Sequence, residues 1–320
     1  MGPILLRPNY ISPVWSGPRI NEARGLEADV WYGESFDVSV HEGLVNMVEG
    51  GPFDGMPLDQ LIDEHREEIM GECAGDPGIV QVLTMDAAQN LSVQVHPDEA
   101  YAQAYEHDHE KTESWYILAA DPGATIILGT TTDDIGALRA AAADDTIGER
   151  YGRRVPVEEG DFVLVPAGTL HALGAGVFAL EVGSFGFKTY RICDWGRGRE
   201  LHVKQGFDVL RTESRPEPRR LGALDPKAPA GVRRGITTSI FVSDVADVRS
   251  SWTQDTCSRY HIISCVAGTA KVETEDGTAA LAPTRSLIVP ASAGSYTVEG
   301  CCRVLRSYAA HSCEFEEEDK

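Results

Sequence analysis

Short apolar runs separated by glycine, proline and aspartate turns dominate this chain, and few stretches repeat every three to four residues as a helix does. A helical period predicts helices over 57–71, 133–145 and 203–212. Alternating or short apolar runs predict strands at Glu34–Val40, Ile79–Leu83, Leu91–His96, Ser114–Leu118, Thr125–Leu128, Phe162–Val165, Val177–Val182 and Thr189–Cys193. The pattern therefore predicts a mainly β protein with a few helices.

A weak internal repeat relates the two halves of the chain. In the first half WYILAADPGATIILG precedes VEEGDFVLVPAGTLHALGAG, and in the second YHIISCVAGTAKVE precedes TAALAPTRSLIVPASAGSYTVEG. Each copy has a strand, a glycine turn, a second strand, and an apolar strand ending in Val-Pro-Ala. We expect two small antiparallel β-barrels, with the added helices near the first, because barrels leave no open sheet edge. The second copy lacks histidine and glutamate at the matching places, so metal chemistry is expected only in the first.

The region around 211–235 is rich in proline, arginine and glycine and predicts a linker. We therefore expect a catalytic domain at 1–212, a linker at 213–235, and a second, degenerate barrel at 236–320 that ends in an acidic tail.

The charge of the chain excludes several classes of partner. It has 50 acidic and 28 basic residues, a formal net charge of −22, which argues against nucleic acid and anionic membranes as partners. A small anionic substrate needs only a locally basic site. Seven cysteines without a C-x-x-C pair indicate reduced thiols, and no signal-peptide or membrane-spanning pattern is present, so a cytoplasmic protein is expected. The sequence does not indicate the oligomeric state.

The stretch GDFVLVPAGTLH carries the strongest candidate for chemistry. It places Gly160, Pro166, Gly168 and His171 in the pattern G-x5-P-x-G-x2-H. A strand that runs into a Pro-Gly turn presents its histidine at the mouth of a barrel. The pattern resembles the second motif of cupins, whose histidine binds a metal, although the asparagine that often follows is Ala175 here. Taken alone, a histidine in this position is more often an ordinary hairpin residue than a ligand, and it is the other candidate ligands that favour metal binding.

Two further segments supply polar side chains with strand alternation. In LSVQVHP, Ser92, Gln94 and His96 share one face, which is either a solvated sheet edge or the lining of a barrel. In KTESWY, Lys111 and Glu113 share a face, which is either exposed or directed into the same cavity. Two histidines, one glutamate and one glutamine suit a borderline divalent ion such as zinc. The loop histidines of HDHE, His107 and His109, are expected to be solvated rather than ligands.

Several stretches in series resemble the short bacterial form of type I mannose-6-phosphate isomerase, a member of the cupin superfamily. They are LSVQVHPDEAYA, KTESWYIL, VPAGTLHALGAGVFALEV, TYRICDWGR and RELHVKQGFDVL, and the resemblance covers about residues 1–212. It implies two cupin-like barrels of the jelly-roll type. It also implies one zinc ion per chain, with the ligands Gln94, His96, Glu113 and His171.

The resemblance also implies the substrate and the catalytic groups. Members interconvert mannose 6-phosphate and fructose 6-phosphate through an enediol. Ser92 and Lys111 match positions at the phosphate end of the substrate, Arg191 matches the active-site arginine, and Glu181 matches an acidic residue proposed for proton transfer. Arg191, Glu181 and Lys111 are thus the expected catalytic set. Other interpretations remain open, since Glu181 could pair with Arg191 as a support and Ser92 could bond only to the main chain.

Two positions depart from the family pattern. Where the family has Q-x-S-S-D-T-T-Y-R this chain has VGSFGFKTYR, so Phe187 replaces an aspartate and Lys188 follows it. The family lysine of LLVKILDA is replaced at Gln81 or nearby. Either the aspartate is dispensable, or the substrate differs, or activity is lost. The alternative function is therefore a non-catalytic or altered-specificity sugar-phosphate-binding cupin. An iron-dependent cupin oxygenase is a third possibility, but it has no need for Lys111 and Arg191.

Overall fold

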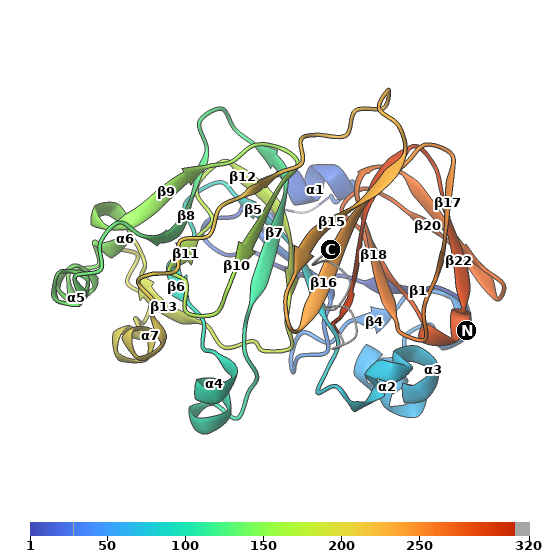
Figure 1. Cartoon of the computed structure of the whole chain (residues 1–320), viewed down its shortest axis with the longest axis horizontal. Coiled ribbons are helices and arrows are strands. Elements are labelled where there is room, and N and C mark those ends of the chain that lie inside the picture. The colour runs from blue at the N-terminus through green and yellow to red at the C-terminus, as the bar shows by residue number, and fades with distance from the viewer. Residues whose placement is uncertain (28, 311–320) are drawn as a thin grey trace, which may run out of the picture.

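Four antiparallel sheets, arranged in two pairs that lie side by side, form most of the fold (Figure 1). The computed structural model describes residues 1–27 and 29–310, so the predicted acidic tail lies outside the described residues. The first sheet has the order β14 (Arg219–Arg220), β10 (Asp161–Val165), β7 (Glu113–Ala120), β12 (Val177–Gly183), β5 (Gln81–Ala87), β3 (Glu34–Val38) and β2 (Asn9–Ile11). The second sheet has the order β13 (Tyr190–Cys193), β6 (Val93–Val95), β11 (His171–Ala172), β8 (Thr125–Thr130) and β9 (Gly152–Pro156).

The other pair of sheets is built mainly from the C-terminal part of the chain. The third sheet has the order β15 (Gly231–Thr237), β16 (Phe241–Val248), β23 (Cys302–Ala309), β18 (His261–Gly268), β21 (Ser286–Val289), β1 (Ile4–Arg7) and β4 (Met47–Val48). The fourth has the order β17 (Ser251–Asp255), β22 (Ser295–Glu299), β19 (Ala270–Thr274) and β20 (Gly277–Leu281). The N-terminal strand β1 therefore joins the C-terminal half, through pairing with β21.

Seven α-helices and three short 3-10 turns lie among the described residues. The helices are α1 (Arg19–Arg24), α2 (Leu58–Glu64), α3 (Arg66–Met70), α4 (Glu99–Tyr105), α5 (Ile135–Ala143), α6 (Ile147–Arg150) and α7 (Val203–Val209). The 3-10 turns are η1 (Gly51–Phe53), η2 (Glu72–Gly75) and η3 (Ala291–Ala293). None of these helices is long and apolar enough to cross a membrane.

Apolar side chains fill the space inside each pair of sheets and between the pairs. Met85, Trp115 and Val163 belong to the core between the first and second sheets. A larger core that includes Leu180 and Ile262 joins the first sheet to the third. The two halves of the chain are therefore held together by buried apolar surface, whose removal from water stabilises the fold.

The second sheet has one face toward helices and the other toward a cavity, and this positions the candidate site. Val93 and Val95 pack with Leu138 of α5 and Phe207 of α7. Because side chains alternate along a strand, Gln94 points away from these helices. The period-two pattern of LSVQVHP thus arises because one face is buried against helices.

The prediction of a mainly β chain is confirmed, but the described strand pairings form open sheets and do not close either pair into a barrel. The helix expected over 57–71 is two helices, because at His65 the backbone turns away from helical geometry with φ of −127°. The sequence pattern did not indicate α4. Only Ala102 of this helix is buried, so its sequence has almost no apolar period. The carboxylate of Asp98 caps its start by accepting the N–H of Tyr101.

The segment expected to be irregular, 211–235, contains β14 and the beginning of β15. Strand β14 pairs with β10 of the first sheet, and β15 pairs with β16 of the third. The segment therefore passes from one pair of sheets to the other with paired residues at each end. No disulfide joins any two of the six cysteines that the structure describes.

Candidate active site

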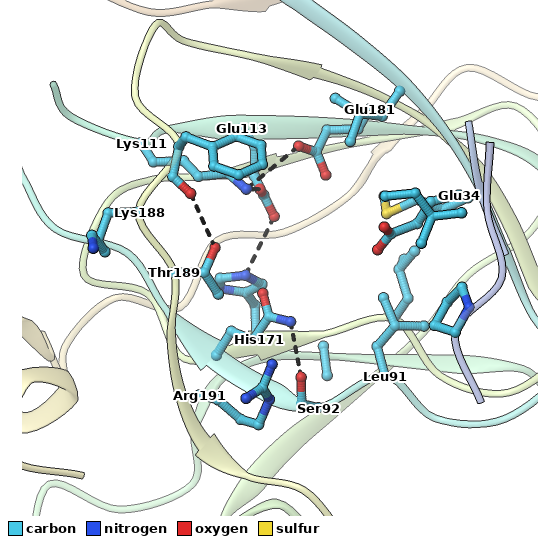
Figure 2. A pocket seen from close by; sticks show the side chains of 18 of the residues that line it. Glu34, Leu91, Ser92, Lys111, Glu113, His171, Glu181, Lys188, Thr189 and Arg191 are labelled. Carbon is cyan, nitrogen blue, oxygen red and sulfur yellow. Dashed lines mark hydrogen bonds and ion pairs between the residues drawn. The ribbon is translucent and has the colours of Figure 1, made fainter. Parts of the chain in front are cut away.

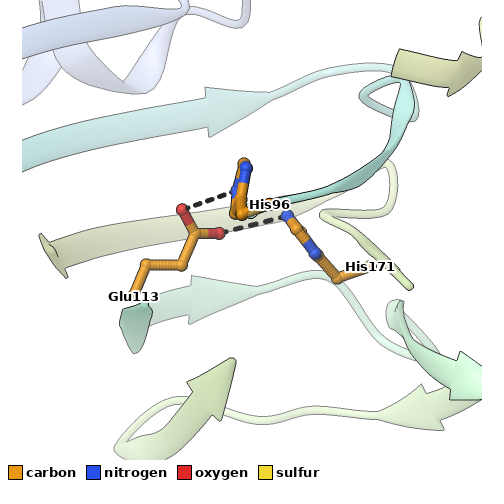
Figure 3. Close-up of side chains that lie close together, drawn as sticks. All are labelled: His96, Glu113 and His171. Carbon is orange, nitrogen blue, oxygen red and sulfur yellow. Dashed lines mark ion pairs between the residues drawn. The ribbon is translucent and has the colours of Figure 1, made fainter. Parts of the chain in front are cut away.

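Three buried side chains with metal-binding atoms converge at one end of a cavity (Figure 3). His96 follows β6, Glu113 begins β7 and His171 begins β11. The Nε2 atom of His96 lies 3.2 Å from Oε2 of Glu113, and Nε2 of His171 lies 3.3 Å from Oε1. One ligand atom from each residue lies within 4.8 Å of the others, and it is the only such group of His, Cys, Asp and Glu side chains among the described residues. We refer to these three residues as the His–Glu–His cluster.

Hydrogen bonds to the main chain fix which ring nitrogen of each histidine carries the proton. Nδ1 of His171 lies 2.8 Å from the carbonyl oxygen of Thr169, and Nδ1 of His96 lies 3.2 Å from that of Lys188. A carbonyl only accepts, so each Nδ1 is the donor and each Nε2 of the neutral ring carries a lone pair. Both Nε2 atoms are buried without a hydrogen-bond partner. Lone pairs that face a carboxylate repel it unless a cation lies between them, and metal-binding histidines are oriented by this kind of bond.

The electrostatics of the cluster favour its metal-binding protonation state. Burial, and secondly the charge of Lys111, lower the pKa of His96 to about 3, and burial also lowers the pKa of His171. Burial alone would raise the pKa of Glu113, but Lys111 and His96 hold it well below its ordinary value. At neutral pH the cluster therefore offers two neutral imidazoles and one carboxylate, which suits a divalent ion.

Gln94 and Ser92 lie beside the cluster on the same side of the sheet. Gln94 is opposite His171 in the pairing of β6 with β11, and its amide nitrogen donates to the hydroxyl of Ser92 at 3.0 Å. This bond leaves the amide oxygen of Gln94 free to act as a ligand. Ser92 is 2% exposed and still lines the cavity.

Lys111 and Glu181 stand next to the cluster. The ammonium of Lys111 lies 3.3 Å from Oε2 of Glu113 and 3.8 Å from Oε1 of Glu181, which confirms that Lys111 and Glu113 share one face. The indole N–H of Trp115 donates to Oε2 of Glu181 at 3.3 Å. Burial, together with the charge of Glu113, raises the pKa of Glu181 to about 8. Two carboxyl groups, of which Glu113 is ionised at neutral pH, and one ammonium are thus grouped at the metal-binding end.

Arg191 enters the cavity from the neighbouring strand β13 and does not contact Glu181. It is opposite Gln94 in the pairing of β13 with β6, and its Nη1 donates to the carbonyl of Glu200 at 3.0 Å. Among the described residues no carboxylate lies within ion-pair distance of Arg191. Glu181 therefore pairs with Lys111 rather than supporting Arg191.

A cavity of about 740 Å³ joins these groups (Figure 2). The cavity is lined by most of the side chains proposed from the sequence, namely Ser92, Gln94, Lys111, Glu113, His171, Glu181 and Arg191. His96 does not line the cavity itself but contacts Glu113, which does. Ser92 and Lys111 do not lie together. In Figure 2, Ser92 is beside Arg191, whereas Lys111 is on the far side with Glu181.

Phe187, which departs from the family pattern, forms part of the cavity wall. Its ring lies 4.5 Å from the ring of His41 and 6.0 Å from the ammonium of Lys111. Gln81 is buried outside the cavity and donates to the carbonyl of Ser184 at 2.9 Å. The two departures therefore have different consequences, because only Phe187 meets the space where a substrate would bind.

Sequence reasoning missed four charged residues of the cavity wall: Glu34, Glu106, Asp108 and Arg199. Glu34 begins β3, and burial raises its pKa although Lys111 and Arg199 oppose this. Asp108 belongs to the loop HDHE, in which only the two histidines have the residue type of a typical zinc ligand that the sequence analysis weighed. Arg199 follows the motif DWGR, and the second arginine of RGR was the signal that could have identified it.

Comparisons with known proteins agree with this site. Residues 16–131 match the family described as phosphomannose isomerase type I, catalytic domain, and residues 239–309 match the mannose-6-phosphate isomerase cupin domain. A mannose-6-phosphate isomerase of Streptococcus mutans is 32% identical, covering 96% of this chain and 98% of that protein. The isomerase ManA of Bacillus subtilis is 33% identical over 67% of this chain and 70% of its own length. A crystal structure of the Bacillus subtilis mannose 6-phosphate isomerase has a TM-score of 0.86, with 28% identity, 96% of this chain covered and 100% of that chain.

The mainly β fold and the His–Glu–His cluster facing a cavity define a cupin-type protein with a metal-binding constellation. More narrowly, the chain belongs to the type I mannose-6-phosphate isomerase family and is an aldose–ketose isomerase.

Proposed function

We propose that this cavity interconverts mannose 6-phosphate and fructose 6-phosphate, with one zinc ion held by His96, Glu113, His171 and the amide oxygen of Gln94. The observation that carries the proposal is the pair of buried Nε2 atoms that face Glu113 without a hydrogen-bond partner. Two imidazoles, a carboxylate and an amide oxygen are ligands that zinc accepts. A bound zinc ion supplies a positive charge that stabilises oxyanions at the sugar's C1 and C2.

The protein's own groups would carry the proton transfer. The enediol route moves one proton from C2 of the open-chain aldose to C1, and a second from O2 to O1. We assign the carbon-bound proton to Glu181, and two observations support this: its carboxyl group lies beside the cluster, and the indole N–H of Trp115 donates to one of its oxygens at 3.3 Å. Lys111 lies between Glu181 and Glu113, where it stabilises negative charge on both carboxylates and on the enediol.

All residues that line the cavity lie between positions 11 and 199. This supports the proposal that the catalytic domain is 1–212 and that the segment after 235 has no part in the chemistry. Within the second half, the buried His261 packs against Tyr296, with Nδ1 2.9 Å from the tyrosine hydroxyl. We propose a structural role for that half.

A second candidate function is favoured by Phe187. A phenyl ring in the cavity wall beside Lys111 takes up space and removes a carboxylate that the family pattern has. This supports an altered preference among sugar phosphates, or binding without turnover.

A coupled assay on the purified protein separates these functions. Fructose 6-phosphate, mannose 6-phosphate and a small panel of other hexose phosphates are supplied with zinc, with chelator, and with zinc added back after chelation. We expect turnover of the first two substrates that chelator abolishes and zinc restores. Turnover confined to another hexose phosphate would show altered specificity, and tight binding without any turnover would show a binding protein.

A further inference from the structure

The cavity wall contains four side chains with a permanent positive charge: Lys111, Lys188, Arg191 and Arg199. Two of them have carboxylate partners that no other Lys or Arg shares, whereas Arg199 shares Asp194 with Arg197. Lys111 is held by the two carboxylates of the metal-binding end. The ammonium of Lys188 lies 2.8 Å from Oε2 of Glu106. An anionic substrate is therefore left with the two arginines.

Both arginines line the cavity and keep donors without a hydrogen-bond partner among the described residues. Nε of Arg191 is buried without a hydrogen-bond partner, and its Nη1 bonds only to the carbonyl of Glu200. Arg199 is oriented by Asp194, which accepts from Nε at 3.0 Å and from Nη2 at 2.5 Å. Nη1 of Arg199 has no partner within the part of the chain that the structure describes. Planar guanidinium groups held in this way match the oxygens of a phosphate.

Carboxylate partners are few for the arginines around Asp194. Asp194 is 1% exposed and also pairs with Arg197, whose Nη2 lies 3.1 Å from its Oδ1. One carboxylate therefore serves two arginines, while Arg191 has none. Burial, and secondly the charge of Arg199, lower the pKa of Arg191, so the two guanidinium groups repel each other. An anion bound between them would relieve this repulsion.

The position of Arg191 relative to the metal-binding end suits a hexose 6-phosphate, and Arg199 lines the same cavity. Arg191 is opposite Gln94 on the next strand, and Gln94 is opposite His171 on the strand after that. Two strand spacings separate Arg191 from His171, which is about 10 Å between main chains. Figure 2 shows Arg191 and Ser92 on one side of the cavity and Lys111 and Glu181 on the other. The reacting carbons and the phosphate of a hexose 6-phosphate are likewise at opposite ends of the sugar.

We propose that Arg199, together with Arg191, binds the phosphate group of the substrate, and that Lys111 belongs to the reacting end. Arg199 is then a residue that determines specificity for phosphorylated sugars. Ser92, whose hydroxyl already accepts from Gln94, can donate its own hydrogen to the same phosphate. This assignment rests on the proposed function and separates Ser92 from Lys111, which the family resemblance places together.

The chain offers a matched control for the test, because Arg197 and Arg199 share Asp194 but only Arg199 lines the cavity. Arg199→Gln is compared with Arg197→Gln in the zinc-loaded protein. We expect Arg199→Gln to raise KM for fructose 6-phosphate and the inhibition constant for inorganic phosphate, each by about 10- to 100-fold, as for a lost charge-assisted hydrogen bond. Arg197→Gln should change both by less than about threefold, since it lies outside the cavity. Zinc content should be unchanged in both.

Arg199→Lys keeps the positive charge but not the planar guanidinium group, so its KM and its inhibition constant for phosphate should lie between those of the wild type and Arg199→Gln. This variant keeps the proposal testable if Arg199→Gln folds poorly. Equal effects of Arg197→Gln and Arg199→Gln, or a fall in kcat with phosphate inhibition unchanged, would overturn the assignment. Calorimetric titration of inorganic phosphate into the two variants tests the assignment without turnover. If the wild type binds phosphate through Arg199 but isomerises no hexose phosphate, the proposed function fails and the phosphate assignment survives.

Discussion

The Nδ1–H of His96 donates a hydrogen bond to the main-chain carbonyl of Lys188 at 3.2 Å. Lys188 lies in the segment between β12 and β13 where the sequence departs from the family pattern. This bond directs Nε2 of His96 toward Glu113, so the segment with Phe187 helps to prepare the metal-binding atoms.

The same segment is held by a carboxylate from the loop HDHE. Oδ2 of Asp108 accepts the main-chain N–H groups of Phe187 and Lys188, both at 3.0 Å. The two segments touch so closely at Gly186 that a Cβ there would lie 2.1 Å from the carbonyl oxygen of His109. Asp108 is therefore a positioning residue that acts on His96 through the main chain of Lys188.

Asp108→Ala should weaken zinc binding by about tenfold, the lower end of the range for residues that orient metal ligands. The two N–H groups would lose their acceptor, and the carbonyl of Lys188 would no longer hold the His96 ring in place. A competition titration of zinc against a chelator measures the effect.

Two variants control this experiment. Asp108→Asn keeps an oxygen that can accept both N–H groups and should restore most of the affinity. Glu106→Gln removes the ion pair to the Lys188 ammonium but keeps an oxygen that can accept from the Tyr190 hydroxyl. It should leave zinc affinity within about twofold, because partly exposed ion pairs contribute little. Equal zinc affinity in Asp108→Ala and the wild type would contradict the positioning role.

His171→Ala should abolish stoichiometric zinc binding, because it removes one of two imidazoles and leaves the carboxylate of Glu113 with a single histidine. Zinc per chain is measured by elemental analysis after dialysis. His109→Ala is the matched control, since this loop histidine bonds to Glu99 and lies outside the cluster. Retention of one zinc per chain in His171→Ala would exclude it as a ligand.

Arg191→Lys should lower kcat/KM for fructose 6-phosphate by about tenfold or more while the free energy of unfolding changes by less than about 1 kcal/mol. A lysine ammonium is a point charge and cannot present two parallel donors to a phosphate. Steady-state kinetics and urea unfolding of the same preparation give both quantities. An unchanged kcat/KM would indicate that Arg191 has only a structural role.

A buried arginine of the C-terminal half, held by an ion pair within that half, also bonds to the first half of the chain. Arg303 is 2% exposed and bonds through Nε and Nη2 to both oxygens of Asp247, at 2.5 Å and 2.9 Å. Its Nη1 also donates to the hydroxyl of Tyr116 at 3.0 Å, on the strand that carries Glu113.

Arg303→Ala should lower the free energy of unfolding by about 3 kcal/mol, because it leaves Asp247 and the Tyr116 hydroxyl buried with fewer partners. The control is Arg233→Ala, which removes a half-exposed partner of the same carboxylate and should cost less than about 1 kcal/mol. Urea unfolding curves measure both. Similar losses for the two variants would show that burial of Arg303 has no special importance.

The parts of the site that were predicted from sequence are those that depend on strand alternation. Lys111 and Glu113 are two residues apart, so their shared face follows from the period of a strand. The same rule places Gln94 on the face of β6 that is turned away from the helices, whereas Val93 and Val95 pack against them. The motif around His171 predicted a strand followed by a turn, and the structure contains both.

The parts that were not predicted depend on contacts between distant segments. Nothing in the local pattern indicates that β1 pairs with β21, or that Asp108 reaches the main chain of Phe187. Arg199 lies in a loop without regular period, so only its position in the folded chain shows that it lines the cavity. The separation of Ser92 from Lys111 likewise depends on where the strands lie in the two facing sheets.

The most direct test of the central claim is a zinc titration of chelator-treated protein, with the rate of isomerisation of fructose 6-phosphate as the readout. We predict that the rate rises linearly with added zinc and saturates at one ion per chain, with no rise in His171→Ala. Full turnover in the metal-free wild type, or no turnover with zinc bound at one ion per chain, would contradict the account.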